Sequence, residues 1–201
     1  MKRLIIIGAG GHGKVCAEIA KDMNCWNEIC FLDDSFPKNK KCLDFNIVGG
    51  IKEICIYKNH DFFVAIGNNK VRGELILSLL NKQINIATLI HPTAYISEYS
   101  SIGIGTSVHQ FAVVNTDTKI GRGCIINTSS IIEHENTIAD FVHISPNVSL
   151  GGQVSIGEYS WIGIGSTLVN NISIMMKTTI GAGSIVISSP INNGILKGLI
   201  K

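Results

Sequence analysis

The chain has 201 residues, of which 45% are hydrophobic and 16% charged, and its 17 basic and 15 acidic residues leave a formal charge of +2. A core-rich chain of this length has room for one large domain or two modest ones and is not a disordered protein. The near balance of charge predicts neither a nucleic-acid partner nor an anionic membrane surface, and no apolar run approaches the roughly 18 residues of a membrane span.

Neither a secretory leader nor a disulfide framework is predicted. The apolar run at residues 4–7 ends at Gly8, which is too short for the core of a signal peptide. The six cysteines contain no CxxC pair, and their spacing fits neither zinc nor disulfides. We therefore expect a cytoplasmic protein with free thiols.

The first ninety residues predict alternating strands and helices. Apolar runs predict strands over residues 4–7, 29–32, 62–66 and 85–90. Apolar residues at helical spacing predict helices over residues 12–23 and 70–83. This alternation predicts a small Rossmann-like α/β unit with a parallel sheet, and residues 35–60 are interpreted as a variable loop without a functional signal.

A glycine-rich turn follows the first strand. Gly8-x-Gly10-x-x-Gly13, with Asp33 and Asp34 about 20 residues on, matches the dinucleotide fingerprint, in which backbone N–H groups at a helix start hold phosphate. A dinucleotide usually needs two mononucleotide halves, and this region supplies hardly more than one. The motif therefore indicates nucleotide-like phosphates near Gly10 rather than NAD, and a purely structural glycine turn is the alternative.

A six-residue repeat begins after His91-Pro92, which predicts a boundary between residues 1–91 and residues 92–201. Every sixth position from Ile96 to Val186 is Ile, Leu or Val, and small or β-branched residues mostly lie two positions earlier. Neither a helix nor a single strand has this period, whereas a coil of short parallel strands does. Three six-residue sides make an 18-residue turn with the aliphatic residue pointing inward.

The repeat resembles the left-handed parallel β-helix of hexapeptide-repeat acyltransferases, and the handedness comes from that resemblance. A β-helix without catalytic activity is the alternative.

Two histidines of the repeat region are candidates for chemistry. His134 lies between Glu133 and Glu135, and a neutral imidazole can act as a general base near pH 7. The alternative is a surface histidine beside two solvated glutamates. His143 lies nine residues further on, half a turn of the coil, so the two rings cannot readily share one flat face. They could meet across a groove between two packed copies, which would require an oligomer.

Several segments together resemble one subfamily over nearly the whole chain. They are Gly8-Ala9-Gly10-Gly11-His12-Gly13, Phe31-Leu32-Asp33-Asp34, Ala65-Ile66-Gly67-Asn68-Asn69, Leu89-Ile90-His91, Ile126-Asn127-Thr128-Ser129-Ser130, Ile132-Glu133-His134-Glu135 and Val142-His143-Ile144-Ser145. This set resembles the sugar-nucleotide N-acetyltransferases of the UDP-N-acetylbacillosamine type and the related sialic-acid O-acetyltransferases.

The resemblance implies a homotrimer with active sites between subunits. It implies that His134 is the general base, with Glu135 as its acidic neighbour. Acetyl-CoA, the co-substrate, would contact His143 and the backbone around Gly152, Ile164 and Ala182. The UDP part of the amino-sugar substrate would be held by Gly10, Gly11, His12, Asp33, Asp34 and Gly67. One departure is the C-terminus, which lacks the Gly-x-Pro-Ala-Lys segment that many members have after the last coil.

The expected reaction is direct acetyl transfer to the amino group of a UDP-linked amino-deoxy sugar. No acyl-enzyme is expected, because GxSxG is absent and no cysteine adjoins these histidines. No metal is expected either, because the spacing of His109, His134 and His143 differs from that of carbonic-anhydrase-like β-helix proteins. O-acetylation of a sialic acid and a non-catalytic nucleotide-binding module are the alternatives.

Overall fold

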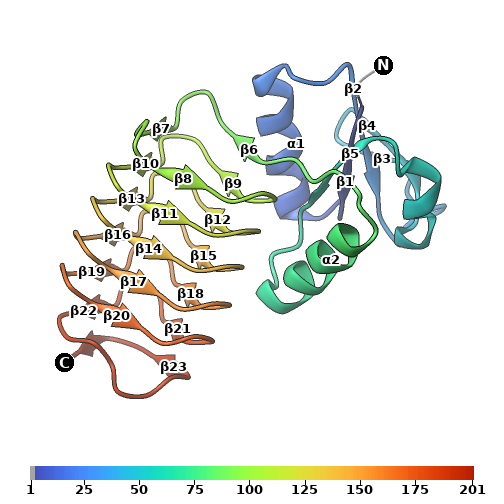
Figure 1. Ribbon diagram of the computed structural model, residues 1–201. Helices are drawn as coiled ribbons and strands as arrows, with labels where there is room; N and C mark the ends of the chain where they lie inside the picture. Colours follow the sequence, from blue (N-terminus) through green and yellow to red (C-terminus); the bar gives the residue numbers. More distant parts are fainter. Residues whose placement is uncertain (1–2) are drawn as a thin grey trace. The chain divides into compact units, whose positions relative to one another are not determined.

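The computed structural model describes residues 3–201, which form two compact units that divide between His91 and Pro92. The N-terminal unit is built around a five-stranded sheet with two helices, and the C-terminal unit is a coil of short strands (Figure 1). Neither helix, α1 or α2, is long and apolar enough to cross a membrane, and the same holds for every helix within residues 3–201.

The N-terminal sheet has the strand order β3-β4-β2-β1-β5. Its strands are β1 (Arg3–Ile7), β2 (Glu28–Leu32), β3 (Lys41–Cys42), β4 (Phe45–Gly49) and β5 (Asp61–Val64). All neighbouring pairs are parallel except β3 and β4, which form an antiparallel edge hairpin. The first connection leads from β1 to one side and β5 lies on the other, so the topology switches direction between β1 and β5, where open α/β sheets bind ligands.

Two expectations for this unit need correction. Residues 35–60 are not one loop, because they contain β3, β4 and the 3-10 helix η1 (Ile51–Tyr57). Residues 85–90 do not form one strand either: a bridge joins Phe62 to Ile86, and only β6 (Leu89–Ile90) is regular. In β4 only Ile47 and Gly49 are buried, which gives a weaker sequence signal than the four consecutive buried residues 4–7 of β1.

Helix α1 (Gly11–Met23) and helix α2 (Asn69–Asn81) follow β1 and β5 in the chain. The buried face of α1 carries Cys16, Ala17, Ile19 and Ala20, which join Leu4, Ile6 and Phe31 of the sheet in one core cluster. The N-cap of helix α2 is Asn68, whose side-chain oxygen accepts the Val71 N–H at 3.1 Å. This N-cap satisfies one of the donors that a helix start leaves open.

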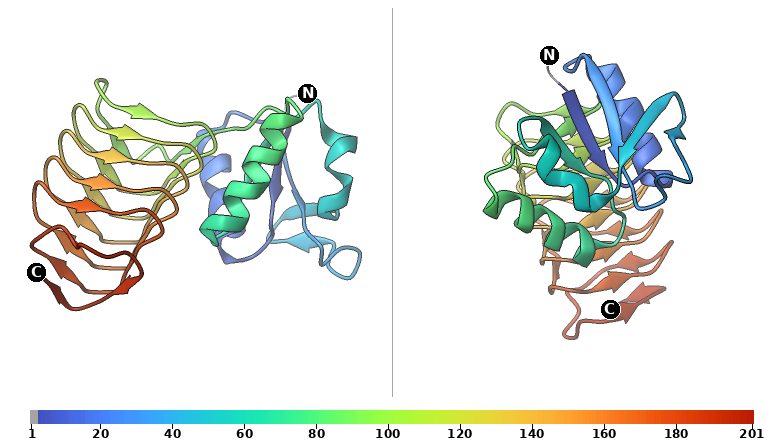
Figure 2. Two further views of the ribbon diagram at one scale, coloured as in Figure 1. Left: turned by 60° about the horizontal axis from the view of Figure 1, so that its bottom comes forward. Right: turned by 90° about the vertical axis from the view of Figure 1, so that its right-hand side faces the viewer.

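The C-terminal unit is a parallel β-helix of two-residue strands, which Figure 2 shows as stacked coils. The strands are β7 (Tyr95–Ile96), β8 (Ser101–Ile102), β9 (Ser107–Val108), β10 (Val113–Val114), β11 (Lys119–Ile120), β12 (Ile125–Ile126), β13 (Ile131–Ile132), β14 (Thr137–Ile138), β15 (His143–Ile144), β16 (Ser149–Leu150), β17 (Ser155–Ile156), β18 (Trp161–Ile162), β19 (Thr167–Leu168), β20 (Ser173–Ile174), β21 (Thr179–Ile180), β22 (Ile185–Val186), β23 (Ile195–Leu196) and β24 (Leu199–Ile200).

The pairing confirms the 18-residue coil. Ile126 pairs with Ile144, and Ile144 pairs with Ile162. One sheet contains β7, β10, β13, β16, β19, β22 and β24; a second contains β8, β11, β14, β17 and β20; and a third contains β9, β12, β15, β18, β21 and β23. From Val108 to Val186 the repeating aliphatic side chains are at most 4% exposed, so they fill the interior.

The atypical C-terminus continues the coil. Strand β23 pairs with β21, and β24 pairs with β22, so residues 195–200 supply two further sides without a Pro-Ala segment. The sequence departs from the family pattern here, but the backbone still forms ladder hydrogen bonds on the exposed end of the last coil.

Candidate active site

Three loops meet at the carboxyl edge of the N-terminal sheet. The glycine loop follows β1, Asp33 and Asp34 follow β2, and residues 65–68 follow β5. Because neighbouring parallel strands end at the same edge, the sequence brings these predicted substrate-binding residues together. The hydrogen bonds are consistent with this, because Asp33 Oδ2 accepts the Ala9 N–H at 2.8 Å.

The glycines of this edge fall into two kinds. Gly8 has a φ of +99°, and a Cβ on Gly13 would lie 2.0 Å from the Gly8 carbonyl oxygen, so both are required by the fold itself. Gly10, Gly11 and Gly67 have no positive φ, and a Cβ on any of them would meet nothing within 4 Å. The protein's own packing therefore does not explain these three glycines, whereas a ligand approaching the backbone would.

The two acidic residues after β2 organise loops. Asp33 Oδ1 accepts the Ser35 N–H at 2.9 Å, and Asp34 Oδ1 accepts the Ile51 N–H at 3.0 Å. Burial raises the pKa of Asp33, but the hydrogen bonds from Ala9 and Ser35 outweigh it and leave this pKa below its usual value. Asp33 is therefore a carboxylate that holds the glycine loop.

A buried arginine braces the loop that contains Gly67. Arg72 of α2 is 1% exposed, and its Nη1 donates to the carbonyl oxygens of Ile66 and Gly67 at 2.9 and 3.1 Å. Its Nη2 donates to Asn69 Oδ1 at 2.7 Å. Arg72 was not among the predicted site residues, and the only sequence signal for it is a cation on the apolar side of an amphipathic helix.

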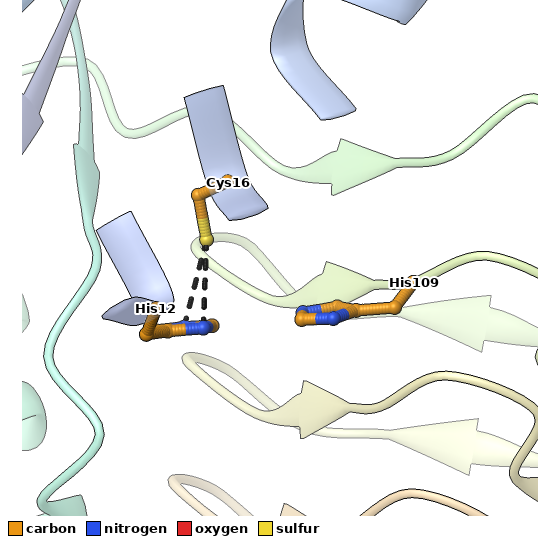
Figure 3. Close-up of side chains that lie close together, drawn as sticks. All are labelled: His12, Cys16 and His109. Carbon is orange, nitrogen blue, oxygen red and sulfur yellow. Dashed lines mark hydrogen bonds between the residues drawn. The ribbon is translucent and has the colours of Figure 1, made fainter. Parts of the chain in front are cut away.

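His12 is the second residue of α1. Figure 3 shows its imidazole beside the thiol of Cys16, one helical turn later, at 3.6 and 3.7 Å from the two ring nitrogens. Burial raises the pKa of the Cys16 thiol, so this sulfur stays protonated.

In the C-terminal unit, His134 and Glu135 lie in the turn between β13 and β14. His134 Nδ1 is 2.9 Å from Glu135 Oε2. A carboxylate only accepts hydrogen bonds, so Nδ1 carries the proton in the neutral ring and Nε2 keeps a lone pair. Hydrogen bonds from His134 and Gln153 lower the pKa of Glu135, so this carboxyl stays ionised.

Glu133, the other acidic neighbour, is directed elsewhere. Its Oε2 accepts a hydrogen bond from Asn115 Nδ2 at 3.0 Å. Of the two glutamates that flank the imidazole in sequence, Glu135 is the one that bonds to it. Backbone conformation explains the difference in part, because Glu135 adopts a left-handed φ of +59° at the corner of the coil.

The imidazole lies directly on Gly152. A Cβ built on Gly152 would be 2.5 Å from His134 Cε1 and 2.6 Å from Nε2. Gly152 occupies the same turn as His134 one coil further on, and Gln153 N donates to the His134 carbonyl oxygen at 3.0 Å. The ring therefore has its observed position because residue 152 lacks a side chain.

The other predicted acetyl-CoA residues line one groove on the β-helix. A cavity of about 400 Å³ is lined by His143, Ile164 and Ala182, with Asn127, Ser145, Pro146, Trp161, Gly163, Thr179, Ile180 and Gly181. The rings of His143 and Trp161 are stacked at 5.6 Å with an angle of 7° between their planes. Trp161 was missed at sequence level, although its outward position next to an inward Ile162 on the same strand follows from the repeat.

The predicted residues of this unit thus occupy two places. His134, Glu135 and Gly152 lie together after β13 and β16, and His143, Ile164 and Ala182 lie along β15, β18 and β21 of another sheet. Within the part of the chain that the structure describes, neither His134 nor His143 belongs to a cluster of three metal-ligating side chains.

A chain that combines a Rossmann-like unit with a parallel β-helix carrying an imidazole–carboxylate pair has the features of one class of protein: the β-helical acyltransferases with a nucleotide-binding unit. The comparisons with known proteins agree. A family model described as the PglD N-terminal domain matches residues 3–79. The UDP-N-acetylbacillosamine N-acetyltransferase of Bacillus subtilis (strain 168) is 37% identical over 107 residues, which are 51% of this chain and 49% of that protein. The match thus spans about half the length of this curated relative.

Solved structures match over the whole chain. The acetyltransferase domain of PglB from Neisseria gonorrhoeae has a TM-score of 0.94 at 33% identity, covering 98% of this chain and 97% of that chain. A mutant of perosamine N-acetyltransferase from Caulobacter crescentus, in complex with CoA and GDP-perosamine, has a TM-score of 0.93 at 27% identity, covering 98% and 94%. The chain belongs to this family of sugar N-acetyltransferases. The predicted family, its enzyme class and the fold class, a Rossmann-like unit plus a left-handed parallel β-helix, are confirmed.

Proposed function

We propose that this chain transfers the acetyl group of acetyl-CoA directly to the amino group of a UDP-linked 4-amino-deoxy sugar of the bacillosamine type. The observation that carries the proposal is the His134–Glu135 pair, whose imidazole is held by Nδ1 and rests on Gly152 with Nε2 available as a base. The choice of acyl donor is supported by the similar acetyltransferase domain of PglB, which has been solved in complex with acetyl coenzyme A.

The reaction needs one base and one site for negative charge. The sugar nitrogen attacks the thioester carbonyl carbon while His134 Nε2 takes the proton that the amine loses. Glu135 stabilises the imidazolium that forms, as its ionised state and the 2.9 Å contact allow. The Gly152 N–H stabilises the oxyanion of the tetrahedral intermediate. The C–S bond then breaks, and the imidazolium returns the proton to the CoA thiolate.

The groove beside His143 suits the acyl donor. Ile164 is 52% exposed and Trp161 is 48% exposed, so two large apolar side chains are available to a ligand in this groove. We assign the CoA arm to this groove, against His143, Ile164 and Ala182. Trp161 Nε1 donates to Ser145 Oγ at 2.8 Å, so the indole is fixed in place before the donor arrives.

The carboxyl edge of the N-terminal sheet suits the nucleotide. Gly10 and Gly11 leave the N-terminus of α1 open, where backbone N–H groups attract a diphosphate. His12, Asp33, Asp34 and Gly67 lie on the same edge and would contact the remainder of the UDP moiety. The named activity of the Bacillus subtilis relative favours UDP over the GDP that accompanies the perosamine enzyme.

A homotrimer would bring the two halves of the acyl-transfer site together. His134 and His143 lie on different sides of one coil. Both can serve one active site if His134 of one copy faces the acetyl-CoA groove of the next copy. The outer face of the sheet that contains β13 supports this packing, because Tyr95, Ile131 and Ile185 are 58%, 40% and 49% exposed. The equivalent outward positions of the sheet with β11 and β14 are polar, Lys119 and Thr137.

The test is a parallel assay of three acceptors. Purified protein with acetyl-CoA receives a UDP-4-amino-6-deoxy sugar, the corresponding GDP-4-amino sugar or a sialic acid, and thiol release is followed. We expect turnover with the UDP sugar, and His134→Ala is expected to lower kcat by about 10²–10⁴ because a positioned base contributes this much. Light scattering in the same buffer is expected to give the mass of three chains.

The other outcomes each contradict a defined part of the proposal. Turnover of sialic acid alone would mean an O-acetyltransferase, in which His134 deprotonates a hydroxyl instead. Nucleotide-sugar binding without thiol release from any acceptor would mean a binding module. Unchanged turnover in His134→Ala would remove this imidazole from the mechanism.

A further inference from the structure

We infer that Asn136, a buried residue that touches neither proposed substrate, positions the Gly152 N–H so that it can donate a hydrogen bond to the oxyanion. The inference rests on the proposed acetyl transfer. Asn136 is 0% exposed and occupies the inner corner of the coil directly after His134 and Glu135. It is the one residue between Ala94 and Ser184 at this position of the repeat that is neither small nor β-branched.

The amide of Asn136 ties two successive turns together. Its Nδ2 donates to the carbonyl oxygens of Glu133 and His134 in its own turn. The same nitrogen lies 3.0 Å from the Gly151 carbonyl oxygen in the next coil, and Oδ1 accepts the Val154 N–H at 3.0 Å. Asn136 therefore links the turn that carries the base to the turn that carries Gly152.

The Cys124 thiol also contacts carbonyls of its own turn and of the next coil, those of Arg122 and Ala139, whereas hydroxyls at other corners contact one or the other. Some hydroxyls donate to the carbonyl three residues earlier in their own turn: Ser100 to Ser97, Ser130 to Asn127 and Ser184 to Gly181. Others donate to the carbonyl 15 residues later, in the next coil: Thr106 to Gly121, Thr118 to Glu133, Ser160 to Met175 and Ser166 to Gly181. Asn136 makes both kinds of contact at the single corner that adjoins the proposed base.

The contact with Gly151 fixes the plane of the Gly151–Gly152 peptide. In a trans peptide the C=O and the N–H point in opposite directions. Because the Gly151 carbonyl points inward to Asn136, the Gly152 N–H points away from the interior of the coil. That is the side on which the His134 ring lies over Gly152.

The next corner in the same column shows what the amide adds. Val154 lies one coil below Asn136 at the equivalent position, and its side chain is fully buried without a donor. A branched apolar side chain therefore fits this column, and the fold does not need asparagine there for volume. What a valine cannot do is hold the Gly151 carbonyl.

The test compares a loss variant with a rescue variant. Asn136→Val removes the donor, and Asn136→Thr restores it, because Thr106 and Thr118 both donate to the carbonyl 15 residues later. Ser160→Ala is the matched control, since it removes the same kind of contact at a corner away from Gly152. We measure kcat, KM for both substrates, the pH profile and Tm for each variant with acetyl-CoA and the acceptor that the wild-type protein uses.

We expect Asn136→Val to lower kcat about 10- to 100-fold, because a misaligned oxyanion donor loses much of its effect. The KM values for acetyl-CoA and for the acceptor stay within about threefold of wild type. The acid limb of the profile of kcat/KM against pH does not move, because the His134–Glu135 contact is intact. Asn136→Thr keeps kcat within about threefold of wild type. Ser160→Ala lowers Tm by a similar amount to Asn136→Val but keeps kcat.

Two results would overturn the inference: a kcat for Asn136→Val within threefold of wild type, or an equal loss in Asn136→Thr. If the valine variant does not fold, Asn136→Ala removes the same donor without adding volume and is judged by the same criteria. Failure of the proposed function is recognised separately, because it would show as an active His134→Ala variant or as no acetyl transfer by the wild-type protein.

Discussion

The position of the His134 ring on Gly152 makes Gly152→Ala a sharp test of the site geometry. The added Cβ would lie 2.5 Å from Cε1 and 2.6 Å from Nε2 of the imidazole. Carbon atoms in contact are normally about 3.5–4.0 Å apart, so the ring has to retreat by about 1 Å or rotate away. The side chain of His134 is 51% exposed, so the ring can leave without disturbing the core.

The expected consequence is a loss of rate without a loss of stability. A displacement of about 1 Å can cost about 10²-fold in rate, which is about 2.7 kcal/mol of activation free energy. Gly152 has no positive φ, so alanine fits its backbone, and the unfolded chain loses entropy. We therefore expect kcat to fall about 100-fold while Tm stays unchanged or rises slightly.

Thiol release and thermal unfolding, measured on the same preparations, check this prediction. Asn170→Ala is the control, because Asn170 occupies the equivalent turn position one coil after Gly152 and is exposed. It is expected to match wild type in both measurements. A Gly152→Ala variant with kcat within twofold of wild type would show that the ring's place on Gly152 is not used in the reaction.

Two further predictions follow from the site. Glu135→Gln removes the anion that stabilises the His134 imidazolium. The plateau of kcat/KM therefore falls about tenfold, and the acid limb of the profile of kcat/KM against pH moves to lower pH. An acid limb at higher pH would contradict the role assigned to Glu135. Gly10→Ala keeps Tm because its Cβ meets only open space, but weakens UDP binding about tenfold by calorimetry. Gly13→Ala, whose Cβ would lie 2.0 Å from the Gly8 oxygen, lowers the free energy of unfolding by about 2–4 kcal/mol. Equal Tm values for Gly10→Ala and Gly13→Ala would contradict the division into a structural Gly13 and a Gly10 that the fold does not need.

Much of the fold follows from the sequence because a repeat of six constrains the backbone at every coil. Ile126, Ile144 and Ile162 are predicted to point inward and to pair, and they do. Strands of the N-terminal unit with a continuous buried apolar run, such as residues 4–7 of β1, carry an equally clear signal. Short edge elements do not, since β3 has two residues and its burial depends on neighbours that are distant in the chain.

The site is less accessible to sequence reasoning than the fold. A histidine between two glutamates suggests a base with a carboxylate, but the left-handed corner at Glu135 and the hydrogen bond of Glu133 to Asn115 are visible only in the structure. Arg72 and Asn136 act through backbone carbonyls, and a single sequence carries no signal for the carbonyls that a side chain will reach. Trp161 is visible in the sequence as an outward residue, yet its stacking on His143 depends on the pairing of β15 with β18.

The glycine loop shows how one motif can have two physical meanings. A structural turn and a phosphate-binding turn are alternatives when only the spacing Gly8-x-Gly10-x-x-Gly13 is known. In the structure Gly8 and Gly13 meet the structural requirement, through a positive φ and a close approach of helix to strand. Gly10, by contrast, leaves space that no part of the N-terminal unit fills. The motif is therefore divided between its members: the outer glycines build the turn, and the glycine between them leaves the space at the start of α1 that the proposed diphosphate contact needs.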